Sequence, residues 1–410
     1  MLLTMNENKR LQIMQEVLAR VRTVAEAATA LEITERQTFR VLAGVRKSGA
    51  LGVIHGNRGR EPWNKTPDET KAKVVKTRRE EYEGFNDRHF TDELEDEGIL
   101  KLGRETVRKI LRSSGIVPMK VIKKRIHRSR RKPMEKFGEM LQGDGSFHDW
   151  LEGRGPWLML IHFVDDATNY EWADFFEGET TEAYFRVTMG ILKNHGLPRC
   201  LYVDHHGVFS VNRPDTLEEQ LSGTKPVTTF ERAMRELAVS VILAGSAQAK
   251  GRVERRGGFN QDRLVSDLRK ANACTIEDAR AILKKYLKKI NKRFARKPAN
   301  SESAFTPLPE SCDLKQILCW KEERTVSNDN TISFRGKAYQ IQSSLYRTSW
   351  AKCKVAVHLC LDGSMHVFHK GQRIAYFKKI GVKWDDLPNA PLNTRALHIH
   401  TPTLTFSRGH

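Results

Sequence analysis

The N-terminal part of the chain repeats apolar residues at intervals of three and four, the pattern of amphipathic helices. The apolar positions of residues 11–21 predict a first helix, and a short second helix is expected over residues 23–31. Thr34 is placed as the N-cap of a third helix that runs to about residue 47. The tight turn between the second and third helices predicts a helix-turn-helix DNA-binding domain over residues 1–56.

In a helix-turn-helix unit the second helix of the motif enters the major groove by its N-terminal end. The polar residues in the corresponding helix are the predicted DNA contacts, namely Arg36, Gln37, Arg40, Arg46 and Lys47. The alternative is an ordinary three-helix bundle with a polar face. This segment taken alone is compatible with either interpretation.

Residues 57–65 have no apolar periodicity and contain Gly, Arg and Pro, which predicts a basic linker. Arg58 and Arg60 flank a glycine and are candidate minor-groove contacts, although a solvated linker explains them equally well. Helical spacing and a second turn between helices return over residues 66–118, which predicts a second helix-turn-helix domain. Its expected DNA contacts are Arg104, Thr106, Arg108 and Lys109.

A basic connector over residues 119–137 is expected to separate these helical units from the rest of the chain. It contains nine Lys or Arg residues and one acid, Glu135, which is the composition of a segment that tracks phosphates. The predicted phosphate contacts in it are Lys124, Arg125, Arg128, Arg130 and Arg131.

Over residues 138–300 the helical spacing gives way to buried strands that alternate with helices. Three adjacent strands are succeeded by a crossover helix, a strand, a helix, a strand and a long helix. This order predicts an α/β domain with a mixed sheet and helices on its faces. Asp144 lies on the first strand, Asp204 at the end of the fourth, and Glu254 in the first turns of the last helix.

Five short strands separated by turn signals then recur over residues 320–380 and predict a small SH3-like β-barrel. Residues 381–410 are expected to form a C-terminal tail. The chain is therefore predicted to be multidomain, with all-α units first, an α/β core in the centre and a small β domain last.

The composition of the chain indicates a nucleic acid as a partner. The 410 residues include 70 Lys and Arg against 50 Asp and Glu, a net charge of +20. At roughly 150 residues per domain the length suits two to four domains. A positive excess of this size is expected of a protein that neutralises phosphates, and the alternative is that it only maintains solubility.

Other classes of protein are disfavoured. The sequence has no apolar run long enough to span a membrane, and its first residues lack the order of a secretory signal, so no membrane partner and a cytoplasmic, DNA-associated location are expected. The six cysteines form no CxxC pair, so neither a disulfide framework nor a zinc ribbon is indicated.

Asp144, Asp204 and Glu254 are the candidate catalytic residues and metal ligands. Three carboxylates at one end of a sheet disfavour one another's ionisation unless a cation lies between them. Oxygen ligands suit Mg²⁺, and two such ions about 3.5–4 Å apart can stabilise the attacking and leaving oxygens of a phosphodiester displacement. Two Mg²⁺ ions per site are therefore expected, with Mn²⁺ as an alternative ion.

Other residues compete for these roles. Asp165 and Asp166 come directly after an apolar strand and are most simply explained by a turn. Glu254 could instead be a solvated helix residue that pairs with Lys250 four residues earlier. The histidines at 205 and 206 could contact metal or DNA, but a pair of histidines at a strand end is more often structural.

Three segments resemble a known family, the retroviral-integrase-like DDE transposases of bacterial insertion sequences, in the ISNCY-type group. They are GDGS at 143–146, YVDHHG at 202–207 and SAQAKGRVERRGGFNQDRLV at 246–265. The resemblance implies an RNase H-like integrase core in which Asp144, Asp204 and Glu254 chelate magnesium. Helix-turn-helix units before the core and a small barrel after it are also similar to these transposases.

Two features depart from the family pattern. The spacing of 50 residues from Asp204 to Glu254 exceeds that in compact members, and residues 212–228 look like the insertion responsible. Many relatives place Lys or Arg seven residues beyond the Glu, where this chain has Gln261. The candidate substitutes for that DNA contact are Lys250, Arg252 and Arg255.

The resemblance implies an enzyme that binds the terminal repeats of an insertion sequence, cleaves the ends by metal-dependent hydrolysis and joins the 3′-hydroxyl to target DNA. Its partners would be double-stranded DNA and at least one further copy of the chain, because two ends must meet. One rival is a catalytically inactive, sequence-specific repressor, which would need only residues 9–118. The other is an RNase H-like nuclease, which would cut without joining.

Overall fold

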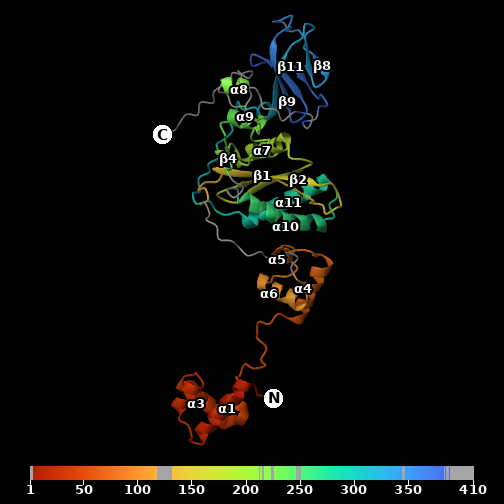
Figure 1. The fold of residues 1–410 in the computed structure, drawn as a ribbon. Coiled ribbons are helices and arrows are strands. Elements are labelled where there is room, and N and C mark those ends of the chain that lie inside the picture. Colours follow the sequence, from red (N-terminus) through yellow and green to blue (C-terminus); the bar gives the residue numbers. More distant parts are fainter. Residues whose placement is uncertain are drawn as a thin grey trace. The chain divides into compact units, whose positions relative to one another are not determined.

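The fold is described from a computed structural model of the chain. The described residues are 3–117, 132–211, 213–214, 217–222, 226–245, 251–343, 347–382, 384 and 387. Most of the predicted connector and tail, including Lys124, Arg125, Arg128, Arg130 and Arg131, therefore lie outside the described residues. The chain forms two compact units, Met1–Val74 and Val75–His410, and residues within each unit contact mainly one another (Figure 1).

The first unit has three helices, and each begins directly after a threonine that caps it. They are α1 (Met5–Leu18), α2 (Val24–Ala30) and α3 (Glu35–Ser48), and the 3-10 turn η1 (Gly49–Val53) comes directly after them. Thr4 and Thr23 each form a capping box, and the Thr34 side chain accepts a hydrogen bond from the amide of Gln37. These helices pack around a small apolar core of Ile13, Met14, Ala27, Leu42, Val45 and Val53.

Three further helices precede the sheet: α4 (Asp68–Glu80), which crosses the boundary between the units, α5 (Asp87–Asp96) and α6 (Arg104–Ser113). α5 and α6 pack against each other, and Arg112 on α6 is 2.5 Å from Asp87 on α5. The buried aromatic side chains of this group are Tyr82, Phe85 and Phe90.

A five-stranded mixed sheet forms the centre of the second unit, which confirms the prediction for the core. Its strands are β1 (Met140–His148), β2 (Leu158–Asp165), β3 (Glu171–Phe176), β4 (Cys200–Val203) and β5 (Ser240–Leu243), in the order β3-β2-β1-β4-β5. β1, β2 and β3 are antiparallel neighbours, whereas β4 is parallel to both β1 and β5.

Helices cover both faces of this sheet (Figure 1). They are α7 (Thr181–His195), α9 (Thr229–Glu236), α10 (Val253–Lys270) and α11 (Ile276–Phe294). The short helix α8 (Leu217–Ser222) precedes α9, and its Leu217 and Leu221 side chains are exposed. Because side chains alternate along a strand, Ile161 and Phe163 of β2 join the core beneath α7, whereas Leu158 and Leu160 join the core beneath α10 and α11.

The C-terminal part forms two small antiparallel sheets. After α12 (Leu314–Ile317), the strands are β6 (Cys319–Thr325), β7 (Thr331–Phe334), β8 (Lys337–Gln340), β9 (Lys354–Cys360), β10 (Met365–His369) and β11 (Gln372–Phe377). One sheet has the order β11-β10-β9-β6 and the other pairs β7 with β8. β6 lies before the five strands that the sequence pattern indicated, and closure into an SH3-like barrel stays a prediction.

In the described part of the chain, no helix combines the length and the apolar character that crossing a membrane requires.

Candidate active site at the ends of two parallel strands

Asp144 and Asp204 are brought together by the pairing of β1 with β4. The parallel register joins Met140 to Cys200 and Gln142 to Tyr202. Continued for two more residues, it places Asp204, which comes directly after β4, level with Asp144. Because side chains alternate along a strand, the two carboxylates share the sheet face on which Gln142 lies. Both residues are half-buried.

The buried Tyr184 of α7 lies close to both carboxylates. Its pKa is raised well above the ordinary value, first by burial, then by the charge and hydrogen bond of Glu179, and further by the charges of Asp144 and Asp204. The phenol therefore stays protonated and donates to Glu179 Oε1 over 2.7 Å. Negative charge from three acids thus converges on this end of the sheet.

Glu254 lies in the first turn of α10, which begins beside β1. The amide of Val253 donates to Gln142 Oε1 over 3.3 Å, so the start of the helix is fixed on the same sheet face as Asp144. Glu254 itself is exposed, which leaves its carboxylate accessible to a ligand. The five residues 246–250, among them Lys250, lie outside the described part of the chain.

Two buried acids hold the start of α10 against the sheet. Arg252 Nε is 2.9 Å from Asp166 Oδ1, and Arg256 Nε is 3.3 Å from Glu171 Oε2. Both acids are fully buried. Because Arg252 and Arg256 stand two residues before and two residues after Glu254, these pairs fix the turn that carries it.

The two competing acids at the end of β2 have other partners. Asp165 accepts hydrogen bonds from the amides of Gly138 and Thr168, at 2.9 and 2.8 Å, and burial raises its pKa. Asp166 accepts from the Met134 amide and from Gln142 Nε2, both at 2.7 Å, besides its pair with Arg252. These contacts give Asp165 and Asp166 a structural role in the turn and beneath α10.

The sequence pattern did not point to Glu179, which precedes α7. Its Oε1 atom accepts from Tyr184 and lies 3.7 Å from His206 Nδ1. The amide of His206 in turn donates to Asp204 Oδ1 over 3.1 Å, so these residues form a continuous polar group. The available signal was the position of Glu179 shortly after β3, directly before the N-cap Thr180.

The two glycines of the GDGS segment lie where a side chain would clash. A Cβ atom at Gly143 would lie 2.6 Å from the Phe163 ring, and one at Gly145 would lie 2.8 Å from the Glu179 carboxyl carbon. The glycines therefore allow the sheet neighbour β2 and the acid before α7 to pack closely on β1 beside Asp144.

Gln261 lies over the same strand. Its Nε2 atom donates to Ser146 Oγ over 3.1 Å, two residues beyond Asp144. The position seven residues after Glu254 is therefore close to β1, but it carries a neutral side chain in this chain.

The predicted DNA contacts on α3 all lie on its exposed surface, and they are Arg36, Gln37, Arg40, Arg46 and Lys47. On α6, Arg104, Arg108 and Lys109 are exposed, whereas Thr106 is half-buried. Arg108 pairs with Glu105 on its own helix at 2.6 Å.

The remaining predicted contacts differ in their surroundings. Arg58 forms an ion pair with Glu7, and Arg60 is exposed. Arg255 is exposed, and its Nε donates to the Gly251 carbonyl. Arg252, by contrast, is mostly enclosed by its contact with Asp166.

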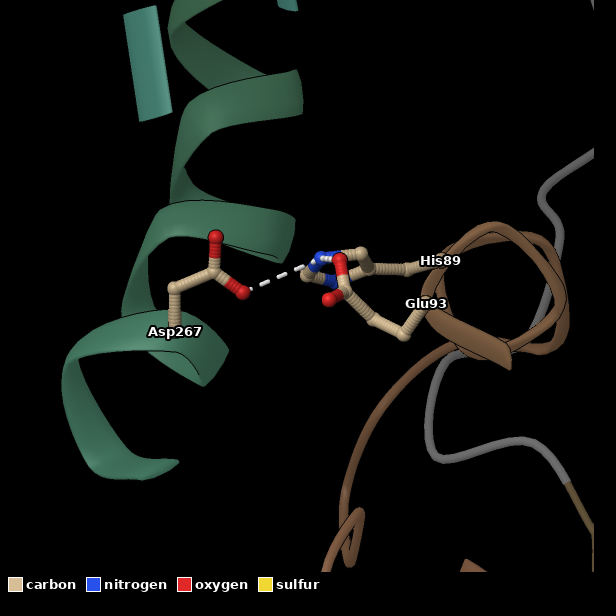
Figure 2. Close-up of side chains that lie close together, drawn as sticks. All are labelled: His89, Glu93 and Asp267. Atoms are coloured by element: carbon tan, nitrogen blue, oxygen red, sulfur yellow. Dashed lines mark ion pairs between the residues drawn. The ribbon is translucent and has the colours of Figure 1, made fainter. Parts of the chain in front are cut away.

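A second group of acids and a histidine joins α5 to α10. His89 Nε2 lies 3.2 Å from Glu93 Oε1 and 3.1 Å from Asp267 Oδ1, so one ring nitrogen contacts both carboxylates (Figure 2). Burial opposes charge on His89, but the hydrogen bonds to Asp267 and Glu93 outweigh it and raise its pKa. Lys289 Nζ contacts the same oxygen of Glu93 at 2.5 Å.

The ligand atoms of His89, Glu93 and Asp267 lie within 4.8 Å of one another, close enough for a metal ion. However, the raised pKa of His89 favours the imidazolium form, which together with the Lys289 ammonium offsets the charge of the two carboxylates. A neighbouring pair, Arg263 with Asp92 at 2.9 Å, is also buried and joins the same two helices. We therefore interpret this group as the docking contact of α5 on the core.

Known proteins resemble this chain over most of its length. No protein-family model matches the chain. The chain is 32% identical over 379 residues to the putative transposase y4bF of Sinorhizobium fredii, an alignment that covers 92% of this chain and 82% of that protein. It is 30% identical over 373 residues to the transposase for insertion sequence IS1202 of Streptococcus pneumoniae, covering 82% of this chain and 78% of that one.

Solved structures are less similar to the chain in sequence than these transposases are. The HTLV-2 integrase catalytic core domain in complex with magnesium, in its dimeric form, is 16% identical, with 38% of this chain and 88% of that chain covered and a TM-score of 0.28. The simian T-cell lymphotropic virus intasome in complex with the PP2A regulatory subunit B56 gamma is 14% identical, with 76% and 100% covered and a TM-score of 0.32.

Proposed function

Because the chain belongs to the transposases of insertion sequences, we propose that it cleaves and joins DNA at one metal-dependent site formed by Asp144, Asp204 and Glu254. The observation that carries this proposal is the register of β1 with β4, together with the anchoring of α10 beside Gln142. These contacts support a site at one end of the sheet to which three acids, 60 and 50 residues apart in the sequence, would contribute.

The donor set suits a hard divalent cation. Asp144, Asp204 and Glu254 offer only carboxylate oxygens, which are preferred by Mg²⁺ and accepted by Mn²⁺. Two of the acids are half-buried and one is exposed, so phosphate oxygens can reach the site. When bound, two Mg²⁺ ions would offset the charge of the acids and of the phosphate and would activate the attacking oxygen.

The proposed reaction has two in-line steps at this site. In the first, a water oxygen attacks the phosphorus at the transposon end, the bond from phosphorus to O3′ breaks, and a 3′-hydroxyl remains. In the second, that hydroxyl loses its proton and its oxygen attacks a target phosphodiester, which releases a new 3′-hydroxyl in the target. Both steps depend chiefly on positioning and charge stabilisation, which these acids would supply together with the metal.

Double-stranded DNA is the proposed partner, both as the terminal repeats and as the target. The exposed cations on α3 and α6 would contact the repeats, and the two ends that must meet imply a homodimer or a larger assembly on DNA. In this proposal Arg252 positions α10 through Asp166 instead of contacting DNA.

Strand transfer by the purified full chain with Mg²⁺, on DNA bearing the ends that flank its own gene, tests the proposal. Wild-type protein should yield joined product, and Asp204→Ala should yield none while it still binds the DNA. Asp149→Ala is the matched control, since Asp149 caps a turn after β1 and is expected to leave the activity intact. Equal activity of Asp204→Ala and wild type would remove Asp204 from the mechanism.

The same assay separates the rivals. Binding without cleavage by the wild type would favour the repressor, and cleavage without joining would favour the nuclease.

A further inference from the structure

Helix α11 and the residues after it are unusually rich in cations. Residues 279–297 contain nine Lys or Arg residues and no acid. These residues are Arg280, Lys284, Lys285, Lys288, Lys289, Lys292, Arg293, Arg296 and Lys297.

One side of α11 is buried in the core of the domain. Leu283, Tyr286 and Ile290 belong to the cluster that also contains Leu160 and Phe175 of the sheet. This packing fixes the orientation of the helix, so the residues on its opposite side must point away from the sheet.

Three of the nine cations lie at the flanks of the buried side and have acidic partners. Arg280 is 3.2 Å from Asp174 on β3. Lys289 contacts Glu93, and Arg293 is 2.8 Å from Asp92, both on α5. The acidic helix α5 therefore lies against one flank of α11.

The other six cations are exposed, and we call them the α11 basic surface: Lys284, Lys285, Lys288, Lys292, Arg296 and Lys297. Within the described part of the chain, none of them has an acidic group within ion-pair distance. The surface is therefore an uncompensated strip of positive charge.

The strip runs along the helix axis. Lys284, Lys288 and Lys292 stand four residues apart, which places them on successive turns and spreads them over about 12 Å. Like charges at this spacing repel and destabilise a helix. A line of negative charge alongside the helix would remove that repulsion.

A nucleic acid fits this surface better than a protein. None of the large exposed apolar side chains of the described residues lies on α11, so the surface has no apolar anchor of the kind found at the centre of protein interfaces. Lysine is also depleted at such interfaces, whereas phosphate contacts are made chiefly by Lys and Arg.

We propose that the α11 basic surface binds the phosphate backbone of duplex DNA without reading its sequence. The proposal extends the proposed function by adding a DNA-binding surface outside the helical units and outside the acidic site. It rests on the proposed function only in that the protein acts on DNA, because binding can be measured without cleavage.

The test compares two triple variants of the full chain that have the same reduction in charge. Lys284→Gln with Lys288→Gln and Lys292→Gln removes the three charges that lie along the helix axis, which are half of the α11 basic surface. Lys193→Gln with Lys378→Gln and Lys379→Gln removes three exposed lysines from α7 and from the segment after β11. Affinity is measured by fluorescence anisotropy over a range of salt concentrations, on a duplex with the transposon ends and on an unrelated duplex.

The α11 variant should bind both duplexes at least about tenfold more weakly. Its slope of log affinity against log salt should fall by about 0.9 for each phosphate that the protein no longer neutralises. The control variant should bind like wild type. Unchanged affinity and slope in the α11 variant, or an equal weakening in the control, would overturn the proposal. Weaker binding to the end sequence alone would contradict sequence-independent binding.

A footprint on wild-type protein gives an independent measurement. Acetylation of Lys284, Lys288 and Lys292 should fall when duplex DNA is present, while acetylation of Lys193 should not change. Equal labelling with and without DNA would contradict the proposal even if the variants bound weakly. Neither measurement requires strand transfer, so failure of the catalytic proposal would be seen separately.

Discussion

At the scale of single residues, the candidate site is a place where negative charges are held close to a buried hydroxyl. Tyr184 donates to Glu179, and the glycine at 145 leaves the room that the Glu179 carboxylate occupies. Asp204 is connected to the same group through the amide of His206. Like charges at one end of a sheet repel one another, so we expect these acids to add no net stability to the native fold when no cation is bound.

This repulsion distinguishes a metal-binding acid from a structural one. Without added metal, Asp204→Asn should leave the free energy of unfolding unchanged or raise it slightly. Asp166→Asn should lower it by about 3 kcal/mol, because it removes the fully buried negative charge that pairs with Arg252. Urea unfolding of the two variants in the presence of a chelator measures this difference. Equal destabilisation by both substitutions would contradict the assignment of Asp204 to the metal site.

The hydroxyl of Tyr184 gives a second prediction at this scale. Tyr184→Phe keeps the buried ring but removes the donor to Glu179, so the free energy of unfolding should fall by about 1.5 kcal/mol. Strand transfer should fall less than in Asp204→Ala, because the three proposed ligands remain. Tyr202→Phe, at a half-buried tyrosine of β4, is the matched control. A complete loss of strand transfer in Tyr184→Phe would show that the phenol takes part directly.

At the scale of elements, the most informative contact is that of α5 with α10 and α11. Its ion pairs include Arg263 with Asp92, which is buried on both sides, and His89 between Glu93 and Asp267. Buried pairs of this kind contribute modestly to net stability but favour one specific arrangement. Helix α5 is therefore joined to α10 and α11 through charged contacts, which makes the docking sensitive to pH.

The sign of this dependence is set by the two pKa shifts. The pKa of His89 is raised from 6.5. Its contribution to the stability of docking is therefore present below pH 6.5 and is lost as the pH rises through the higher pKa of the folded state. Burial opposes the charged form of Glu93, but the contacts with His89 and Lys289 outweigh it and lower the pKa from 4.5 to about 2. The contribution of Glu93 to the stability of docking is therefore present above pH 4.5 and is lost on acidification towards pH 2. Docking should therefore be most stable between about pH 4.5 and 6.5.

Hydrogen exchange of the α5 amides measures the docking directly. Protection should be greater at pH 6 than at pH 9 after correction for the intrinsic exchange rate, and His89→Gln should reduce that difference. His55→Gln, at an exposed histidine of the first unit, is the control and should leave the difference unchanged. Protection of α5 that is equally strong at both pH values in the wild type would contradict the role of His89.

At the scale of the whole molecule, exposed cations occur both on α3 and on the α11 basic surface, and we expect the two groups to bind DNA in different ways. In the proposed recognition helix α3, the exposed residues at its start would read base edges, whereas the α11 basic surface consists mainly of long, flexible ammonium groups suited to phosphates. We expect a division between a surface that selects a sequence and one that holds any duplex.

This division predicts different outcomes for substitutions in the two surfaces. Arg40→Ala should weaken binding to the end sequence by about 1–3 kcal/mol relative to an unrelated duplex, as is typical when a bidentate base contact is removed. Competition between the two duplexes measures this ratio. Lys9→Ala, on α1 of the same unit, is the control and should leave it unchanged. An equal weakening on both duplexes would show that Arg40 contacts only phosphates.

The sequence by itself determined the local structure and the family. Helix limits are set by Thr4, Thr23 and Thr34, because a capping side chain acts within three residues. The alternation of side chains similarly predicted the mixed sheet, which is confirmed. The GDGS and AQAKGRVER segments indicated the transposases, and similarity over most of the chain confirms that family.

Only the tertiary structure decided which distant residues meet. The register of β1 with β4 sets Asp204 beside Asp144, and packing of α7 on the sheet adds Glu179, which the sequence pattern did not single out. It also pairs Arg252 with a buried acid, although in the sequence Arg252 looks like any surface cation of a basic segment. The physical reason is that periodicity and capping act over a few residues, whereas charge pairing and burial depend on segments that only the folded sheet brings together.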